Sequence, residues 1–533
     1  MVVTDNHRTQ IKRFFKELAK KYPNSPIYLF SSIADGADRF VANIFLDLKK
    51  ENNELAARFE LIVPIPFNVE EYKKDFDDVS CREFDSLIKK AKRSFCITCS
   101  SDMHDRPEKY LKAGKFVADS SIILIALWDG EKGKRGGTAD IVQHKITGDN
   151  ENASESTFEY DGSVFILPCM RNNSGAQKGP VSDEELSLDI VLKDAAIKEA
   201  LEKIEEINYE STRVSCDLLS RSGSGICNKP KSLDPPQKSI LNWYSFLDMS
   251  SLKFRERDNL ITINLFSLGF LLIIALEIYS NIFLTNLVLG ISMFLALLAT
   301  IIYLYSRSSN NHKKYLYNRL LAEALRIQFY WNMAGISRNV SDYILKIHRQ
   351  DLTWIKYIMS AVFGVTYNNK VIDRETIKDL IDNWIKNQAS FFEAAIRKMN
   401  RRLGLLQKVS NISFLTGLGL LLSIFFLGDY YKGHGMLNLL LVIIGSALGL
   451  FALIKGYVQM KSYQQLLNQY ELMHVIYKRA ESKINETDTY DFNQDQKNAY
   501  LKDLFFVIGK EALIESGNWY LIFKGKEPEI EGI

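Results

Sequence analysis

Two pairs of long apolar stretches limit what this chain can fold into more than any other feature of its sequence. Stretches 260–280 and 286–305 are separated by the short segment 281–285, and stretches 412–426 and 437–454 by the polar segment 428–435. A helix of about 20 residues crosses the ~30 Å hydrocarbon core of a bilayer. A pair of buried core helices is the alternative, but such helices rarely extend this far without a polar face. We therefore expect two transmembrane hairpins.

Basic side chains indicate the orientation of these hairpins. Lysines and arginines precede and follow each hairpin, whereas the two reversals carry only Lys432. The positive-inside rule then places both chain ends and the segment between the hairpins in the cytoplasm. An internal duplication is left open, because stretches 317–321 and 463–467, which follow the two hairpins, share a tyrosine and a Leu-Leu pair.

Outside these stretches the composition is that of a soluble protein. The chain of 533 residues carries a formal net charge of +3 and has a mean hydropathy of −0.10. This length predicts several domains, and the small net charge gives no case for nucleic-acid binding. The first residues lack the apolar core of a signal peptide, so we expect everything before the first hairpin to stay in the cytosol.

Residues 1–170 alternate apolar strands with helical patterns. We expect strands at 27–32, 59–65, 94–99, 121–128 and 163–169, with helices at 9–20, 37–48, 70–90 and 138–146. Val2 and Val3 suggest a short first strand, 150–158 a surface loop, and 182–207 a closing amphipathic helix. Near-continuous apolar strands separated by helices predict a parallel sheet covered on both faces. Ligands of such folds bind outside the carboxyl ends of the strands.

The turn after the strand at 27–32 carries the first candidate site. Gly36 allows a close approach of the backbone to a ligand, and Ala37 keeps the position open. Asp35 or Asp38 would cap the following helix or hold a ribose hydroxyl. This turn therefore predicts part of a nucleotide site.

The turn after the strand at 121–128 carries the second candidate site. Gly136, Gly137 and Thr138 stand at a helix start, where free N–H groups and the positive helix end favour a phosphate. Arg135, together with two neighbouring lysines, would close over the anion. A tight turn with a helix cap is the alternative. Asp129 is either a further ribose contact or a polar strand end.

These residues carry a resemblance. Segments 31–39, 63–67, 71–76, 125–130 and 136–140 together resemble the SLOG family of nucleotide-sensing, Rossmann-like domains. That superfamily includes the LOG-type phosphoribohydrolases, the DNA-processing protein DprA and the N-terminal domain of TRPM channels. Such domains usually open with a strand that runs into Gly-His-Arg, of which this chain keeps His7 and Arg8 but not the glycine. The resemblance implies a nucleotide pocket lined by two groups of residues: Arg8, Ser31, Ser32, Asp35, Gly36, Ala37, Asp38 and Arg39, and then Gly136, Gly137, Thr138 and Asp140.

The membrane part carries a second resemblance. The amphipathic stretch 315–333 and the C-terminal stretch 508–520 resemble the SLATT family. SLATT domains are two-transmembrane effectors that accompany SLOG sensors in bacterial conflict systems. The resemblance therefore implies that a soluble sensor controls the hairpins.

A few polar residues lie within the apolar stretches. An acid within a membrane is a functional candidate by default, although Glu277 stands near the reversal, where it would also reach the lipid headgroups. Gly445 and Gly449 permit close helix approach in the second hairpin, unless they are small residues without a special partner. The pore candidates are Thr262, Asn264, Ser267 and Glu277.

The sequence thus predicts an α/β, Rossmann-like cytosolic domain with a mostly parallel sheet, followed by an all-α membrane region with four transmembrane helices. The expected boundaries are a nucleotide-binding domain at 1–210, a linker at 211–250, a first hairpin with its cytosolic helix at 251–345, a helical connector at 346–400, and a second hairpin with the C-terminal helices at 401–533.

The expected function is that of a nucleotide-gated membrane effector or channel whose oligomer forms a pore or disrupts the bilayer. By resemblance, the setting is antiphage defence at the bacterial inner membrane, and the signal is NAD-derived, ADP-ribose-like or a cyclic nucleotide. We expect lipid and further copies of the chain as partners, and no nucleic acid, metal or tightly bound cofactor.

The alternative is a membrane-anchored nucleotide N-glycosidase or phosphoribohydrolase. The hydrolase relatives carry a Gly-Gly-x-Gly-Thr loop followed closely by an essential glutamate, plus a catalytic arginine. The loop is shorter here and offers Asp140 instead, which favours binding over catalysis, so we predict no catalytic residue. A regulatory membrane scaffold without a pore is a third interpretation.

Overall fold

The chain divides into two compact units that are not contiguous in sequence. The computed structural model describes residues 4–51, 53–98, 105–147, 163–169, 186–214, 226–227, 233–344, 349–368, 372–487 and 493–525. Unit 1 comprises Met1–Cys216 and Ser337–Asn368, and unit 2 comprises Asp217–Ile336 and Asn369–Ile533. Ser337–Asn368 is therefore part of the N-terminal unit, whereas the predicted boundaries divided it between the first hairpin region and the connector.

The strands of unit 1 are short and parallel, as predicted. β1 (Ile27–Phe30), β2 (Phe59–Ile65) and β3 (Arg93–Cys96) form one sheet in that order, with Leu29 opposite Leu61 and Ile62 opposite Arg93. β4 (Ile123–Trp128) and β5 (Ser163–Pro168) form a second parallel pair. In the part of the chain that the structure describes, the strands thus form two sheets, of three and two strands.

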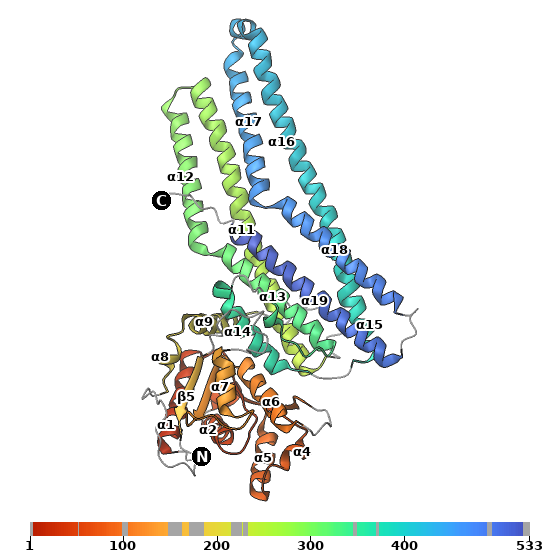
Figure 1. Ribbon diagram of the computed structural model, residues 1–533. Helices are drawn as coiled ribbons and strands as arrows, with labels where there is room; N and C mark the ends of the chain where they lie inside the picture. Colours follow the sequence, from red (N-terminus) through yellow and green to blue (C-terminus); the bar gives the residue numbers. More distant parts are fainter. Residues whose placement is uncertain are drawn as a thin grey trace. The chain divides into compact units, whose positions relative to one another are not determined.

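Helices surround these strands (Figure 1). Side-chain caps explain where several of them begin: the Asp77 carboxylate accepts the N–H of Ser80 at 2.8 Å, and Asp105 accepts that of Glu108 at 3.3 Å. The helices of unit 1 are α1 (Asp5–Lys21), α2 (Ala37–Glu51), α3 (Asn53–Arg58), α4 (Val69–Lys73), α5 (Asp78–Lys90), α6 (Arg106–Ser120), α7 (Thr138–Thr147), α8 (Leu188–Val191), α9 (Ala195–Ser211), η3 (Val340–Asp342) and α14 (Arg349–Thr366). The helix α6 was not among the predicted elements.

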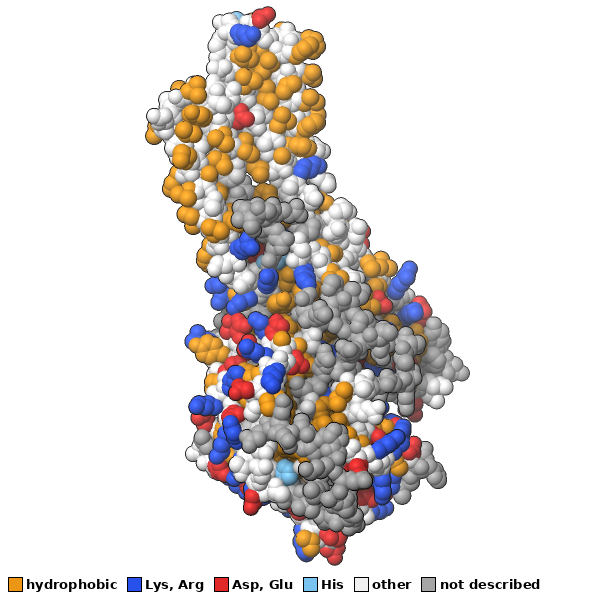
Figure 2. All heavy atoms as spheres, turned by 60° about the vertical axis from the view of Figure 1, so that its left-hand side comes forward, with side chains coloured by type: hydrophobic (Ala, Val, Ile, Leu, Met, Phe, Trp, Pro, Cys, Tyr) orange, Lys and Arg blue, Asp and Glu red, His pale blue; other side chains and the backbone are white. Residues whose placement is uncertain are grey.

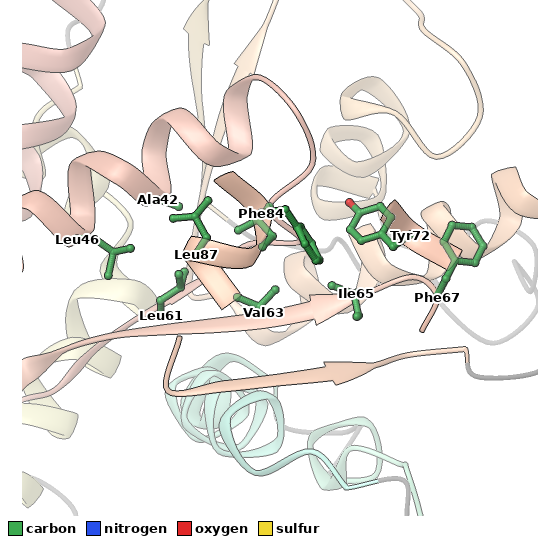
Figure 3. Packing of buried hydrophobic residues seen from close by; sticks show 10 residues of the cluster. Ala42, Leu46, Leu61, Val63, Ile65, Phe67, Tyr72, Phe84 and Leu87 are labelled. Atoms are coloured by element: carbon green, nitrogen blue, oxygen red, sulfur yellow. The ribbon is translucent and has the colours of Figure 1, made fainter. Parts of the chain in front are cut away.

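The strand β2 is buried on both faces, which explains its near-continuous apolar sequence. One face packs against α2 and α5, and Figure 3 shows the side chains that meet there: Ala42, Leu46, Leu61, Val63, Ile65, Phe84 and Leu87. On the other face, Ile62 packs against Phe30 of β1 and Val365 of α14. A helix from a distant part of the sequence, Arg349–Thr366, therefore completes the core of the N-terminal unit.

Unit 2 consists of long helices. They are α11 (Pro235–Asn281), α12 (Asn286–Ser309), α13 (Asn311–Met333), α15 (Arg374–Leu380), the π-helix η4 (Ile381–Lys386), α16 (Asn387–Gly433), α17 (Leu437–Met460), α18 (Tyr463–Glu486) and α19 (Gln494–Lys524). Figure 1 shows α11 with α12, and α16 with α17, as two helical hairpins. The backbone of Leu427 departs from helical angles, where the predicted stretch 412–426 ends.

Four of these helical stretches are long and apolar enough to cross a membrane, as the sequence predicted. Only 6–17% of the residues in their most apolar windows are buried inside the protein, so these helices are not the core of a soluble domain. Figure 2 shows hydrophobic side chains covering the surface of the paired helices, with few charged ones among them. Lipid is the environment that would cover such a surface.

The two hairpins are copies of one architecture. α12 and α17 each contain 24 residues. Asn310 directly follows α12, Ser462 follows α17 after one further residue, and the two lie 152 residues apart. Asn310 and Ser462 both have positive φ, 50° and 48°, where the chain turns into α13 and α18. The structure thus supports an internal duplication.

Some predicted elements fall outside the described residues. These are Val2 and Val3, Cys99 at the end of its predicted strand, the loop at 150–158, and residues 215–225 and 228–232 of the linker predicted for 211–250. From Pro235 onward the predicted linker is already helical and forms the start of α11.

Candidate functional site

The turn from β1 to α2 has an unusual backbone. Ser31 continues the sheet by donating its N–H to the carbonyl of Ile62 at 3.1 Å. Ile33 is fully buried and has a φ of 48°, a left-handed conformation that β-branched residues rarely adopt. Gly36 also has a positive φ, 98°. Such backbone strain is often found at binding sites.

Open space lies at the start of α2. A Cβ atom placed on Gly36 would meet no heavy atom within 4 Å. Within the described part of the chain, the N–H groups of Gly36 and Ala37 donate to no protein acceptor. These donors belong to the positive end of a 15-residue helix. The position is therefore suited to an anion.

The two aspartates of this turn have different environments. The carboxylate of Asp38 accepts the N–H of Ala34 at 3.3 Å and a hydrogen bond from Ser31. Burial raises the pKa of Asp38, although these two hydrogen bonds act in the opposite direction. Asp35, by contrast, is 73% exposed. Asp38 therefore stabilises the turn, and Asp35 is the aspartate that a ligand can reach.

Arg39 is turned into the protein. Its side chain is only 2% exposed, and its guanidinium carbon lies 4.4 Å from the centre of the Phe76 ring. Nε donates to the carbonyl of Ile33 at 3.0 Å, and Nη1 donates to the carbonyl of Ser80 at 2.9 Å. Arg39 therefore fastens the turn and α2 to α5.

The second predicted turn, between β4 and α7, is closed by its own hydrogen bonds. The N–H of Gly136 donates to the carboxylate of Asp140 at 2.8 Å, and the N–H of Gly137 donates to the carbonyl of Lys134 at 2.9 Å. These are the donors that the sequence suggested for a phosphate. An anion at this turn would have to displace the Asp140 carboxylate.

Packing against α6 explains the first glycine of this turn. Gly136 has a φ of 80°, and a Cβ atom there would come within 2.8 Å of the backbone of Pro107 and Leu111. Arg135 is held by Glu108, with Nη2 and Oε2 2.9 Å apart. The turn is therefore fixed to the first turns of α6.

The remaining residues of this turn lie at its rim. Thr138 is exposed and begins α7. Asp129 accepts the N–H of Glu131 at 3.1 Å, so it shapes the loop after β4.

Arg8 lies beside the first turn. Its guanidinium carbon is 5.5 Å from the centre of the Phe40 ring, on the first turn of α2. The preceding residue, His7, hydrogen-bonds through Nε2 to the carbonyl of Pro168 at the end of β5, at 2.8 Å. The structure therefore brings the start of α1 next to both the start of α2 and the carboxyl end of a strand.

Arg106 belongs to a charged cluster that is not among the predicted site residues. Its Nη1 lies 2.5 Å from a carboxylate oxygen of Glu71, and its Nη2 lies 2.5 Å from one of Asp75. The guanidinium carbon is 4.3 Å from the centre of the Phe67 ring. The segment Asp105-Arg106-Pro107, a cap followed by a proline suited to a first helical turn, was the available signal for this helix.

Two tyrosines connect the two predicted turns. Tyr72 donates its hydroxyl hydrogen to the carbonyl of Ser32 at 3.2 Å, and its ring centre lies 5.9 Å from that of Tyr110. Figure 3 shows Tyr72 and Phe67 near the carboxyl end of β2. Tyr110 in turn packs against Gly136 and hydrogen-bonds Asp75. The predicted turns thus belong to one contact network, with α4 and α6 between them.

Three of the four pore candidates lie in the N-terminal half of the predicted first span, 260–280. Thr262 is buried and donates its hydroxyl hydrogen to the carbonyl of Asp258 at 2.8 Å. Asn264 and Ser267 are exposed. In a single copy of the chain, these two polar side chains therefore face outward.

Glu277 lies between the two hairpins. Its carboxylate occupies the position that a Cβ atom on Gly445 of α17 would take, and it accepts a hydrogen bond from the Asn281 amide at 3.1 Å. A Cβ on Gly449 would come within 2.9 Å of Ile273 of α11. The two glycines permit a close helix approach, but their partner is α11 of the first hairpin, whereas the prediction placed this approach within the second hairpin.

Comparisons with family models, with curated proteins and with solved structures give no match to the chain, so its site is defined by this geometry alone.

Proposed function

We propose that this chain is a nucleotide-gated membrane effector, in which unit 1 binds the nucleotide and unit 2 permeabilises the bilayer. One observation carries the proposal: an α/β unit with an open, unblocked helix start is interleaved in sequence with a unit that has four apolar helices long enough to span a membrane. The resemblance of unit 1 to SLOG domains and of unit 2 to SLATT domains supports the same assignment.

The ligand in this proposal is a nucleotide such as an NAD-derived, ADP-ribose-like or cyclic compound. Its phosphate accepts the N–H groups of Gly36 and Ala37, since a helix start favours an anion. Arg8 supplies a second positive charge, and Asp35 accepts from a ribose hydroxyl. In the same proposal the two sheets act as one Rossmann-like sheet, with β1 beside β4.

The effector in this proposal is an oligomer in the bacterial inner membrane with both chain ends in the cytoplasm, acting in antiphage defence. The outward-facing Asn264 and Ser267 support association of copies through α11, because polar side chains within a bilayer seek protein partners or water. Such an assembly either lines a pore with these side chains or disrupts the bilayer around it.

A dye-release experiment with the full-length protein in liposomes tests the proposal. Ala37→Asp places a negative charge at the start of α2, where it repels a phosphate but is compatible with the helix. We expect this variant to lose nucleotide binding and nucleotide-dependent release by at least tenfold. Thr138→Asp is the matched control at the start of α7, whose neighbouring N–H groups are already occupied, and it should behave as the wild type.

Two outcomes would contradict the proposal. The first is full nucleotide-dependent release with Ala37→Asp, and the second is release by the wild type that no nucleotide changes. The same incubations, analysed by chromatography for a released base, test the enzyme alternative. The carboxylate of Asp140 is occupied by the N–H of Gly136, so we expect no base release.

A further inference from the structure

The segment Ser337–Asn368 connects the two units twice. The chain leaves unit 2 after Ile336, contributes η3 and α14 to unit 1, and re-enters unit 2 at Asn369. On one side the segment follows α13. On the other side it precedes α15, which continues through η4 and α16 as one helical stretch, Arg374–Gly433, into the membrane-spanning part. The segment that contains α14 is therefore joined by the backbone to α13 on one side and to α15 on the other.

The C-terminal end of α14 is clamped to the sheet of unit 1. Arg93 of β3 donates from Nη1 to the carbonyl of Val365 at 2.5 Å and from Nη2 to the carbonyl of Tyr367 at 2.8 Å. The ring of Tyr367 stacks on that of Phe95, with centres 5.0 Å apart. The segment is thus held by two hydrogen bonds from the half-buried guanidinium of Arg93 and by aromatic packing.

The same end of α14 packs closely on α6. A Cβ atom on Gly364 would lie 2.5 Å from Cβ of Ser120 and 2.8 Å from the ring of Phe30. Phe116 of α6 and Phe363 of α14 have ring centres 5.8 Å apart. A side chain at position 364 would push the two helices apart, so glycine is what allows the backbone of α14 to lie directly against Ser120 of α6.

Charged groups link the start of this segment to the same region. His144 of α7 pairs with Asp119 at 2.8 Å, and Lys145 donates to the carbonyls of Ala118 and Ser121 at 2.6 and 2.7 Å. The pKa of Asp342 in η3 is raised to about 6, first by burial and then by the neighbouring carboxylate of Asp119. The end of α6 is therefore in electrostatic contact with the start of the returning segment.

The opposite end of α6 lies beside the candidate ligand site. Tyr110 in its first turns packs on Tyr72, whose hydroxyl donates to the carbonyl of Ser32 in the first turn. A helix of 15 residues is a rod of about 22 Å. The helix α6 therefore spans the distance between the ligand site and α14.

We propose that α14 is the coupling element of the protein, through which α6 transmits nucleotide binding in unit 1 to the helices of unit 2. This inference rests on the proposed function and adds the route by which the site regulates the membrane part. Binding repositions α6, α6 carries α14 through the Ser120–Gly364 contact, and the two chain crossings at 336–337 and 368–369 pass the displacement on.

The test separates binding from release in the full-length protein reconstituted in liposomes. Gly364→Ala forces α14 away from Ser120, and Arg93→Gln removes the charged clamp on Val365 and Tyr367. For both variants we expect nucleotide affinity within about threefold of the wild type and nucleotide-dependent dye release reduced at least tenfold. Gly404→Ala on α16 is the control, because a Cβ there meets no heavy atom within 4 Å.

Each outcome has a defined meaning. Wild-type release and unchanged affinity in both variants would overturn the coupling role of α14 and leave the proposed function intact. Loss of nucleotide affinity in both variants would also overturn it, because α14 would then support the ligand site itself. A wild type that neither binds nucleotide nor releases dye would refute the proposed function instead. Should Gly364→Ala fail to fold, Arg93→Gln decides alone.

Discussion

Replacing Arg39 with methionine should destabilise unit 1 rather than act only on nucleotide binding. The substitution keeps a long apolar side chain but removes the donors to the carbonyls of Ile33 and Ser80. Hydrogen bonds from a charged group contribute ~1.5–3 kcal/mol each, and a desolvated cation above an aromatic ring, as on Phe76, adds up to ~2 kcal/mol. Part of this loss is offset, because methionine, unlike the guanidinium, is buried without the desolvation cost of a charge.

The expected net loss for Arg39→Met is roughly 3–5 kcal/mol, the range for breaking a buried charged network. For a unit of this size that loss lowers Tm by on the order of 10 °C. Thermal unfolding of the detergent-solubilised protein measures the shift, and hydrogen exchange should localise it to α2 and α5. Asp35→Asn, at the exposed end of the same turn, is the control and should change stability by less than ~0.5 kcal/mol.

The opposite result would refute this reasoning. If Arg39→Met unfolds at the wild-type temperature while nucleotide binding is lost, the guanidinium contacts the ligand and does not fasten the turn. The buried position of Arg39 would then not represent the nucleotide-bound state.

The other predictions concern unit 2. Gly445→Val should separate α11 from α17, because the new side chain takes the place of the Glu277 carboxylate. The free energy of unfolding, measured by thermal unfolding, should fall by ~1–3 kcal/mol. Gly290→Val, in open space, is the control, and an equal loss of stability in both variants would contradict the close packing of α11 on α17. Burial, and then the charge of Glu323, raise the pKa of Glu515 from 4.5 to about 7. A carboxyl group whose pKa is higher in the folded than in the unfolded protein makes folding less favourable as pH rises between these two values. The free energy of unfolding should therefore fall by at most ~3 kcal/mol as pH rises from 4.5 to 7, and by less because the side chain is partly exposed. Glu515→Gln should remove this pH dependence. If the variant's Tm depends on pH in the same way as that of the wild type, the prediction is wrong.

The membrane part could be predicted from the sequence because its signal is local. Long apolar stretches with short polar reversals predict helical hairpins, because an apolar segment in a bilayer has to satisfy its backbone hydrogen bonds internally and a helix does so. The strand β2 was predicted with its observed bounds for a similar reason: it is apolar throughout and is buried on both faces. The similarity of the two hairpins is seen in the lengths of their helices and the positions of their turns. Comparing the residues of 317–321 with those of 463–467 only suggested it.

The ligand site could be predicted only in part, because the rest depends on contacts between distant residues. The sequence marks Gly136 as a glycine at a helix start, but not that Asp140 folds back onto its N–H or that Pro107 lies against it. An arginine is expected at the surface, yet Arg39 is buried by α5, which lies far along the chain. The docking of α14 on the sheet depends on contacts across more than 200 residues, and no local pattern of 349–366 indicates its partner.

The most direct test of the account is dye release from liposomes that contain only the full-length protein, with and without added nucleotide. We expect tight liposomes in the absence of nucleotide and release on addition of an ADP-ribose-like, NAD-derived or cyclic nucleotide, with release abolished by Ala37→Asp and retained by Thr138→Asp. Release that is equal with and without every nucleotide, or that Ala37→Asp leaves intact, would contradict the claim that unit 1 controls the membrane helices.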